Sequence, residues 1–407
     1  MNKEKQKIVP VLRFPEFEHS EDWVIDKFSS FIKLYRGSSP RPINQFLTKE
    51  ENGVNWIKIG DTKNATNFKI SEVGEKITLE GSKKSRKVIK GELILANSMS
   101  YGATYELEID GCIYDGWFVL REYEDSFDKQ FLLQLLNSNF LQTQYKRLAA
   151  GGIVQNISSV IVYNTLLPKI SKVEQQKIAS CLSSLDNLIT AETDKLDNLK
   201  DHKRGLLQQL FPAEGETQPQ CRFPEFENDG EWDEKKLGQI SRITTGSSNR
   251  EDSTEEEGEY AFFDRSEDIR TSSRYLFDCE AIIVAGEGQK FTPKYFIGKF
   301  DLHQRAYAVM DFDGNSIGKY LFYYIFNNND YFLRYAVGST VKSLRQPIFE
   351  NMPVLIPSNP KEQQKIANCL SSVDDLIEEQ AQKTDTLKAH KKGLMQQLFP
   401  KINDVAI

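Results

Sequence analysis

Two sets of basic and polar residues are the first candidates for binding chemistry in this chain of 407 residues. Lysine and arginine pair with phosphate oxygens, and serine, asparagine and tyrosine can contact phosphates or base edges. The candidates in the first half are Arg36, Ser38, Ser39, Arg41, Lys83, Lys84, Arg86, Lys87, Asn97, Ser98 and Tyr101. Those in the second half are Ser247, Ser248, Arg250, Lys290, Lys294, Lys342 and Arg345. We interpret both sets as candidate contacts with nucleic acid.

Three of these clusters have a predicted local structure. Residues 83–87 are expected to form a basic loop between two strands, where the loop could follow a phosphate backbone, although an ordinary solvated loop fits equally well. The duplicated Gly-Ser segments at Gly37 and Gly246 could donate backbone N–H groups to phosphate, or could be plain turns. Asn97 begins a polar loop after an apolar strand, and that loop could reach base edges.

Short motifs of catalytic sites are missing from the sequence. A base methyltransferase would need an Asp/Asn-Pro-Pro-Tyr/Phe loop, and no two of the 14 prolines are adjacent. The phosphate-loop pattern G-x-x-x-x-G-K-[ST] does not occur, and the five cysteines and four histidines lack zinc-ligand spacing. The sequence therefore predicts no catalytic residue, no cofactor and no metal. A self-sufficient methyltransferase or nuclease is the poorer interpretation.

The elements that must position the candidate residues occur twice. Residues 174–212 begin with Glu-Gln-Gln-Lys-Ile-Ala and end with Leu-Phe-Pro, and residues 362–400 repeat this pattern at numbers 188 higher. The phrase Arg-Phe-Pro-Glu-Phe-Glu begins at Arg13 and again at Arg222, and each copy is followed by a tryptophan. Between these landmarks the two halves have unlike sequences. Such a duplication predicts one repeated frame that presents two different surfaces.

Each long repeat predicts a helix with one narrow apolar stripe, because apolar residues recur at steps of three and four, as in a coiled coil. In the first repeat the stripe consists of Ile178, Leu182, Leu185, Ile189, Leu196, Leu199, Leu206 and Leu210. In the second it consists of Ile366, Leu370, Val373, Ile377, Leu387, Leu394 and Leu398. A helix of roughly 37 residues is about 55 Å long, and so narrow a stripe needs a partner helix. The other repeat is the obvious partner.

An antiparallel pair with twofold-related halves would join positions whose numbers sum to a constant. With a sum of 576, Ile178 meets Leu398, Leu199 meets Ile377, and the other pairs are mostly apolar. Four pairs include a polar residue: Leu185 with Lys391, Glu192 with Thr384, Leu196 with Gln380, and Lys203 with Val373. Such imperfections can fix the register of a coiled coil at some cost in stability. They could also mark the place where another subunit docks.

The segments before the long helices predict two globules of mixed α/β (α+β) class. Short strands are predicted at 56–59, 87–89, 92–96, 117–120, 260–263, 281–285 and 306–310. Each globule ends with an apolar, proline-terminated segment, at 165–168 and 353–357, that leads into the long helix. One helix is predicted in each globule, over residues 131–148 and 319–335. The expected organisation is a globule at 1–170, a helix at 171–212, a globule at 213–357, and a helix with tail at 358–407.

Composition places few limits on function. The net charge of −7 results from an acidic segment between residues 213 and 360, whereas residues 1–170 are slightly basic. Charge therefore neither supports nor excludes binding to nucleic acid. We expect a cytoplasmic protein with reduced thiols, because the sequence has no signal-peptide pattern, no membrane-spanning run and no C-x-x-C pair.

The order of these motifs resembles the DNA-specificity subunit of a type I restriction–modification enzyme. The motifs that carry the resemblance are the Arg-Phe-Pro-Glu-Phe-Glu start, the Gly-Gly or Gly-Ser break, the Glu-Gln-Gln-Lys-Ile-Ala helix start and the Gln-Gln-Leu-Phe-Pro helix end. Each occurs twice, so the resemblance spans nearly the whole chain. It does not include the residues that would recognise DNA.

The resemblance implies two target recognition domains, each reading one half of a split site in double-stranded DNA, and two helices that pair as an antiparallel coiled coil. It also implies two modification subunits with the methyltransferase chemistry, and restriction subunits with motor and nuclease activity. A coiled-coil scaffold with two protein-binding heads remains an alternative, because it would explain the helices equally well.

Overall fold

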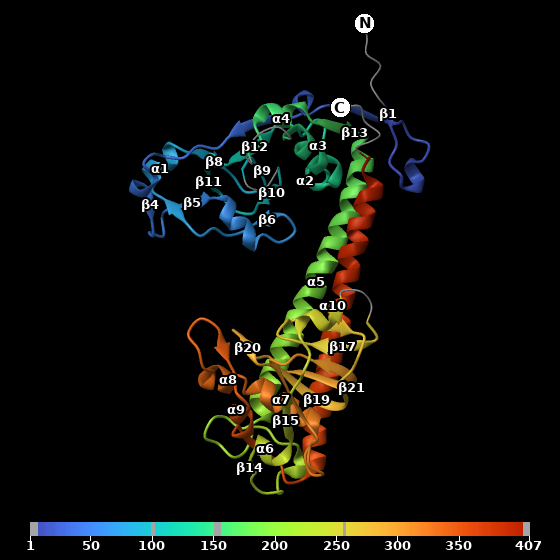
Figure 1. The fold of residues 1–407 in the computed structure, drawn as a ribbon. Helices are drawn as coiled ribbons and strands as arrows, with labels where there is room; N and C mark the ends of the chain where they lie inside the picture. The colour runs from blue at the N-terminus through green and yellow to red at the C-terminus, as the bar shows by residue number, and fades with distance from the viewer. Residues whose placement is uncertain (1–6, 99–101, 150–155, 255–257, 402–407) are drawn as a thin grey trace. The chain divides into compact units, whose positions relative to one another are not determined.

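The computed structural model describes residues 7–98, 102–149, 156–254 and 258–401. The chain divides into two compact units (Figure 1), of which unit 1 comprises residues 1–193 with 383–407, and unit 2 comprises residues 194–382. Each unit therefore combines one globule with part of both long helices. The candidate residue Tyr101 and the glycine break at Gly151 lie outside the described residues.

The two long helices are α5 (Lys172–Leu210) and α10 (Pro360–Leu398), each of 39 residues. Within unit 1 the first part of α5 packs against the last part of α10, since Ile178 and Leu398 belong to one core. Within unit 2 the remaining parts pack in the same way, since Leu210 and Ile366 share a second core. Every residue of the two predicted apolar stripes is buried or half-buried. The mixed α/β class with antiparallel pairing of the helices is thus confirmed.

Strands and short helices form the globule of unit 1. One sheet has the order β3 (Lys33–Arg36), β12 (Trp117–Arg121), β9 (Leu93–Ala96), β10 (Thr104–Leu107), β6 (Lys69–Ile70). A second has the order β4 (Leu47–Thr48), β7 (Lys76–Ile77), β5 (Val54–Ile57), β11 (Gly111–Ile113), β8 (Arg86–Val88). A third joins β1 (Lys7–Ile8), β2 (Trp23–Lys27) and β13 (Leu166–Lys169). The helices are α1 (Leu79–Lys83), α2 (Lys129–Asn137), α3 (Asn139–Ala149) and α4 (Ser159–Asn164).

The globule of unit 2 is built on one larger sheet. Its order is β15 (Arg242–Thr245), β22 (Ala306–Met310), β19 (Phe277–Ala285), β21 (Lys294–Leu302), β17 (Tyr260–Phe263), β18 (Arg270–Ser272), β16 (Ser253–Thr254). Two smaller pairs are β14 (Asp233–Lys236) with β24 (Pro353–Ile356), and β20 (Glu287–Gly288) with β23 (Lys342–Ser343). The helices are α6 (Leu237–Ile240), α7 (Gly318–Asn327), α8 (Asp330–Tyr335) and α9 (Gln346–Glu350).

The single helix predicted in each globule is wrong, because the structure has two helices in each place. Ser138 separates α2 from α3 with an extended backbone, and its hydroxyl donates to the carbonyl of Leu135 at 2.6 Å. Asn328 follows α7, and its side chain donates to the carbonyl of Tyr324 at 2.9 Å. Short polar side chains bond to the last carbonyls of a helix and thereby compete with its continuation. Apolar spacing alone could not reveal these breaks.

The predicted basic loop at residues 83–87 is also wrong in extent. Lys83 ends α1, whose first turn is capped by the Thr78 hydroxyl accepting the N–H of Gly81 at 3.1 Å. Arg86 already belongs to β8, in which Lys87 pairs with Cys112 of β11. The basic residues are therefore distributed over a helix end, a two-residue connection and a strand.

The duplicated Glu-Gln pair attaches each long helix to its own globule. In unit 1, Glu174 accepts hydrogen bonds from Arg13 Nε and Nη2 at 2.7 and 2.8 Å, and Gln175 accepts the N–H of Asp128 at 2.6 Å. In unit 2, Glu362 accepts from Arg222 Nε and Nη2 at 2.7 Å each. These ion pairs explain why the motifs around Arg13 and Glu174 are duplicated together.

Candidate nucleic-acid interface

The first Gly-Ser segment of unit 1 lies against the end of strand β11. A side chain on Gly37 has no room, because its Cβ would lie 1.9 Å from the carbonyl oxygen of Tyr114. The N–H of Ser38 donates to the carbonyl of Ile113 at 3.1 Å. The turn therefore brings Ser39 and the residues after it onto the carboxyl end of a strand.

A carboxylate anchors this turn. The Ser39 hydroxyl donates a short hydrogen bond to Asp115, and Arg41 Nη2 lies 3.9 Å from Asp115 Oδ2. The hydrogen bond from Ser39 lowers the pKa of Asp115, and the positive charges of Arg36 and Arg41 act in the same direction. The Arg41 side chain is 83% exposed. It can therefore reach a ligand while its partner keeps the loop in place.

The same arrangement occurs in unit 2 with other residues. Gly246 lies so close to strand β21 that its Cβ would be 1.7 Å from the carbonyl oxygen of Leu302. The Ser248 hydroxyl donates to Asp301 Oδ1 at 2.5 Å, and Arg274 Nε lies 3.6 Å from Asp301 Oδ2. Both globules thus combine a Gly-Ser turn, the end of a strand, a carboxylate and an exposed arginine. We call this combination the turn–carboxylate–arginine arrangement.

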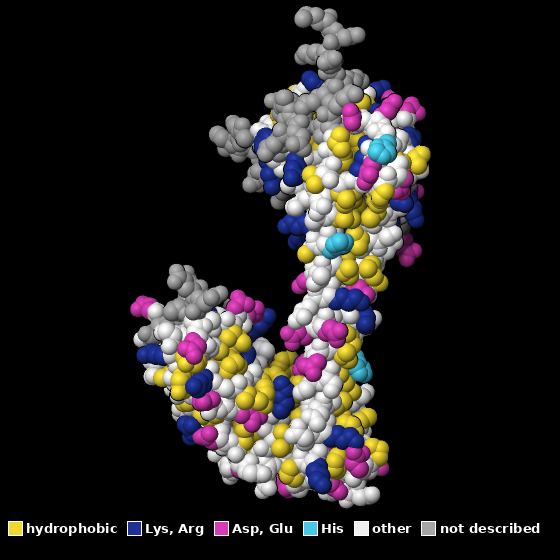
Figure 2. All heavy atoms as spheres, turned by 90° about the vertical axis from the view of Figure 1, so that its right-hand side faces the viewer, with side chains coloured by type: hydrophobic (Ala, Val, Ile, Leu, Met, Phe, Trp, Pro, Cys, Tyr) yellow, Lys and Arg dark blue, Asp and Glu magenta, His cyan; other side chains and the backbone are white. Residues whose placement is uncertain are grey.

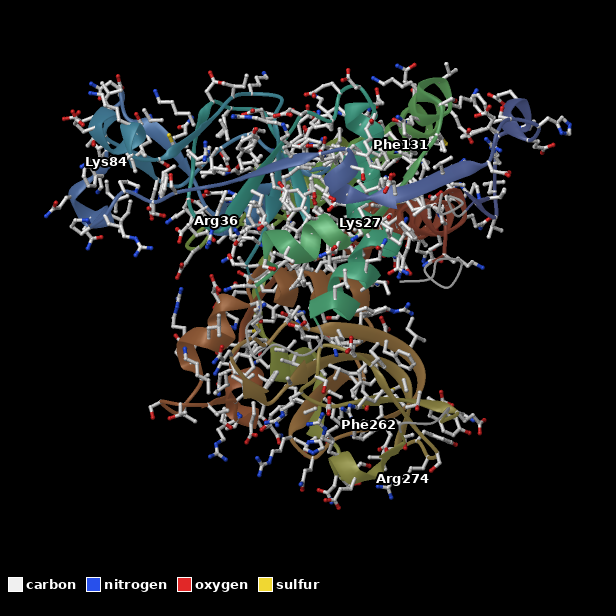
Figure 3. All side chains as sticks on the ribbon, turned by 90° about the horizontal axis from the view of Figure 1, so that it is seen from above. Lys27, Arg36, Lys84, Phe131, Phe262 and Arg274 are labelled. Atoms are coloured by element: carbon white, nitrogen blue, oxygen red, sulfur yellow. The ribbon has the colours of Figure 1, made fainter. Side chains whose placement is uncertain are left out.

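Several other predicted residues of unit 1 gather near the same turn. Arg86 Nε donates to the carbonyl of Arg36 at 3.1 Å, and the Ser38 hydroxyl donates to the carbonyl of Lys84 at 3.3 Å. Figure 3 labels Arg36 and Lys84, which come from β3 and from the connection after α1. The remaining basic residues Lys83 and Lys87 are exposed on α1 and β8. The structure therefore unites basic residues from segments far apart in the sequence.

The polar residues after β9 face an open hollow of about 480 Å³ that also receives Arg36. Asn97 is buried, and its side chain donates to the carbonyl of Asp115 at 2.9 Å, so it supports the turn. The Ser98 hydroxyl lies 3.3 Å from the Tyr114 hydroxyl. Asn156 and Ser158 line the same hollow and were not predicted from the sequence.

The predicted residues of unit 2 have different environments. Ser247, Arg250, Lys290 and Arg345 are exposed, whereas Ser248 is fully buried and stabilises its turn. Lys294 donates to the carbonyl of Ser266 at 2.6 Å, and burial lowers its pKa. Lys342 donates to the carbonyl of Leu333 at 2.9 Å. Lys294 and Lys342 are therefore partly structural, and the exposed positive charge of residues 213–357 comes largely from arginines.

Sequence reasoning predicted Arg41 and Arg250 but missed the three carboxylates and the arginines Arg270 and Arg274. Asp115 stands in an Asp-Gly turn between two strands, which is a recognisable hairpin signal. Asp264 and Asp301 follow or end apolar strands and give no such signal. Asp264 is buried and lies 3.9 Å from Arg250 Nε and 3.8 Å from Arg270 Nε. Burial raises the pKa of Asp264, but the hydrogen bonds from Ser266 and the two arginines lower it on balance.

Neither a metal centre nor a membrane span is visible in the part of the chain that the structure describes. No group of three or more histidine, cysteine, aspartate or glutamate side chains is placed there to hold a metal ion. No helix among these residues is both long and apolar enough to cross a bilayer.

The fold is that of the specificity subunits of type I restriction–modification systems. The S subunit from M. genitalium superposes with a TM-score of 0.63 at 14% identity, covering 97% of this chain and all of that one. A chain from a structural study of complex assembly and conformational transition of the type I R-M system superposes with a TM-score of 0.58 at 18% identity, covering 93% and 98%.

Residues 229–389 match the family model of the type I restriction modification DNA specificity domain. The chain is 27% identical over 143 residues to the EcoDI specificity subunit of Escherichia coli, which is 35% of this chain and 31% of that protein. It is 22% identical over 412 residues to the MjaVIII specificity subunit of Methanocaldococcus jannaschii, covering 93% and 92%. The resemblance to type I specificity subunits is therefore confirmed, and the match to the DNA specificity domain model covers residues 229–389.

Proposed function

We propose that this chain is the non-catalytic DNA-specificity subunit of a type I restriction–modification complex. Residues 1–170 and 213–357 act as two target recognition domains, each reading one half of a bipartite site in double-stranded DNA. The helices in 171–212 and 358–407 set the spacing between the half-sites and dock two modification subunits. Restriction subunits with motor and nuclease activity complete the assembly.

The observation that carries this proposal is the turn–carboxylate–arginine arrangement, which is present in both globules. The frame around it is duplicated, yet the residues that surround it differ. Arg41 in unit 1 and Arg274 in unit 2 are 83% and 52% exposed, and both are held by a carboxylate. Exposed, oriented arginines are suited to phosphate oxygens and to guanine edges. One frame with two unlike surfaces is what recognition of two unlike half-sites requires.

Methylome mapping tests this function directly. Cells that express the chain with its modification subunit should methylate a split motif, and deletion of the chain should abolish that methylation. Arg41→Ala should weaken or relax one half of the motif and leave the other half intact. If deletion leaves the methylome unchanged, or if the purified complex shows no salt-dependent DNA binding, the scaffold alternative is the better explanation.

A helix insertion tests the role of the long helices as a spacer. Seven residues inserted after Thr193 in α5 and seven before Lys383 in α10 keep the heptad pattern and lengthen each helix by about 10.5 Å. The non-specific gap in the methylated motif should then widen by about three base pairs, because DNA rises 3.4 Å per base pair. A changed half-site with an unchanged gap would contradict the spacer role.

Docking of two modification subunits is supported by a pair of equivalent exposed leucines. Leu188 on α5 is 42% exposed and belongs to unit 1, and its repeat equivalent Leu376 on α10 is 50% exposed and belongs to unit 2. Figure 2 shows hydrophobic side chains along the visible face of the helices. Exposed apolar residues at equivalent positions fit two equivalent partners. Leu188→Glu or Leu376→Glu should each lose one modification subunit in native mass spectrometry, and loss of neither would contradict this surface.

A further inference from the structure

We propose that Arg250, Arg270 and Arg274 form a DNA phosphate-binding cluster on unit 2, which we call the arginine trio. This inference rests on the proposed function, because it names the DNA anchor of the second recognition domain. Only Arg250 stands out in the sequence, as part of the duplicated Gly-Ser segment. The other two arginines join it only through the sheet.

The strand register places the residues that hold the trio on one face of the sheet. Phe262 of β17 pairs with Asp301 of the parallel strand β21 and with Arg270 of the antiparallel strand β18. Directly paired residues point to the same face, and so do residues two apart on one strand. The side chains of Asp301, Arg270 and Asp264 are therefore expected on the face of Phe262. The other face carries the apolar core with Phe263, Phe300 and Leu302.

Two buried carboxylates hold the three guanidinium groups. Asp264 Oδ2 lies 3.9 Å from Arg250 Nε and 3.8 Å from Arg270 Nε, and Asp301 Oδ2 lies 3.6 Å from Arg274 Nε. Asp301 also accepts hydrogen bonds from the Ser248 and Ser272 hydroxyls at 2.5 and 2.9 Å, and Arg274 Nη2 donates to the Ser248 hydroxyl at 2.9 Å. The hydrogen bond to Ser248 orients Arg274, whereas Asp264 attracts Arg250 and Arg270 through its charge.

The exposed partners of these ion pairs are positive, although residues 213–360 as a whole are acidic. The side chains of Asp264 and Asp301 are only 2% and 0% exposed, whereas those of Arg250, Arg270 and Arg274 are 53%, 28% and 52% exposed. Solvent therefore meets the positive partners of these ion pairs and not the negative ones. This burial gives an acidic segment a local site for an anion. Figure 3 shows Arg274 at the outer edge of its globule, with Phe262 farther inside.

The chemistry favours backbone phosphates as the ligand. Guanidinium groups bind phosphate oxygens with charge-assisted hydrogen bonds. Arg250 comes from one segment, and Arg270 and Arg274 come from β18 and the residues just after it. The three groups lie around one sheet end, which suits several phosphates along a strand of DNA. Their ion pairs with buried carboxylates restrict the side chains before binding, so less conformational entropy is lost when DNA binds. Glu251 is exposed beside Arg250 in the sequence. Its repulsion of DNA is the same in the wild type and in each arginine variant.

The test uses the complex of the full chain with its modification subunits. Binding is measured against KCl concentration for a DNA with the methylated motif and for a DNA without it. Each substitution of Arg250, Arg270 or Arg274 by alanine should lower the slope of log affinity against log salt by about 0.9. Each should also weaken binding to both DNAs about tenfold. Thermal unfolding verifies that each variant is folded. If Arg270→Ala, at the least exposed position, does not fold, the variants at the two half-exposed arginines Arg250 and Arg274 suffice.

Arg242→Ala is the matched control. Arg242 is also 53% exposed and pairs with a carboxylate, Asp311, at 2.5 Å, but it begins β15, whereas the Gly-Ser turn follows the end of that strand. This variant should keep the wild-type salt slope. Replacing the trio by lysines should retain most of the slope, because a phosphate accepts either cation.

Two results would overturn the inference. Folded alanine variants with the wild-type slope would show that the trio does not contact phosphates. Lysine variants that keep the slope but no longer discriminate between the two DNAs would show that the arginines read bases. In both cases the wild-type complex still prefers the methylated motif, so the proposed function stands. Failure of the wild-type complex to discriminate at all would instead refute the proposed function.

Discussion

Replacing Lys391 by methionine should destabilise the helix pair of unit 1 much more than the equivalent replacement of Lys203 destabilises that of unit 2. The two lysines are repeat equivalents, and each forms an ion pair with an equivalent aspartate. Lys391 Nζ lies 2.5 Å from Asp186 Oδ1, and Lys203 Nζ lies 2.5 Å from Asp374 Oδ1. The chain therefore contains its own matched control.

The expected magnitudes follow from burial. The side chains of Lys391 and Asp186 are each 11% exposed, so the variant leaves a buried carboxylate with the hydrogen bond from Gln134 Nε2 at 3.0 Å but without a cation. Breaking a buried ion pair in this way costs about 3 kcal/mol. Asp374 is 35% exposed and can be hydrated, so the loss of Lys203 should cost only about 1 kcal/mol.

Hydrogen exchange measured by mass spectrometry can report the two helix pairs separately. Amides of α5 and α10 that belong to unit 1 should exchange about 150-fold faster in Lys391→Met, which corresponds to 3 kcal/mol. Those in unit 2 should accelerate about fivefold in Lys203→Met. The double variant Asp186→Asn/Lys391→Met should recover most of the loss, because no charge is then left unpaired. Equal effects in both units, or no recovery in the double variant, would refute the reasoning.

Three further predictions concern the Gly-Ser turns and their surroundings. Ser39→Ala should raise the pKa of Asp115 in a carboxylate NMR titration; the stability that this lowered pKa contributes is present above its ordinary value and is lost as pH falls through the lowered one. Gly246→Ala should lower the melting temperature and weaken DNA binding, whereas Gly205→Ala, in an open position of α5, should stabilise by about 0.5–1 kcal/mol. Burial lowers the pKa of His303, so unit 2 should lose stability as pH falls from 7.5 to 5.5, and His303→Gln should abolish that part of the pH dependence in urea unfolding. A pKa of Asp115 that Ser39→Ala leaves unchanged, equal effects of the two glycine variants, or an unaltered pH profile in His303→Gln would contradict these expectations.

The sequence alone determined the repeated frame of this protein. The long helices, their antiparallel partnership and the mixed α/β class follow from spacing and duplication, because heptad periodicity and strand alternation are local patterns. The gapless repeat also predicted the positions at which polar residues interrupt the apolar stripes of the two helices. It did not reveal the partners of these residues, since Lys391 and Lys203 pair with Asp186 and Asp374 rather than with the apolar residues expected opposite them.

Only the tertiary structure shows which buried carboxylates contact the candidate binding residues. Ser248 and Arg250 are separated from Asp301 and Arg274 by tens of residues, and strand pairing in the sheet of unit 2 brings them together. Register between strands depends on packing of both faces, which a single sequence does not disclose. The same holds for burial, which hides the carboxylates and leaves the arginines exposed. Periodicity therefore predicts the frame, whereas long-range pairing and burial decide where the charges of the binding surface lie.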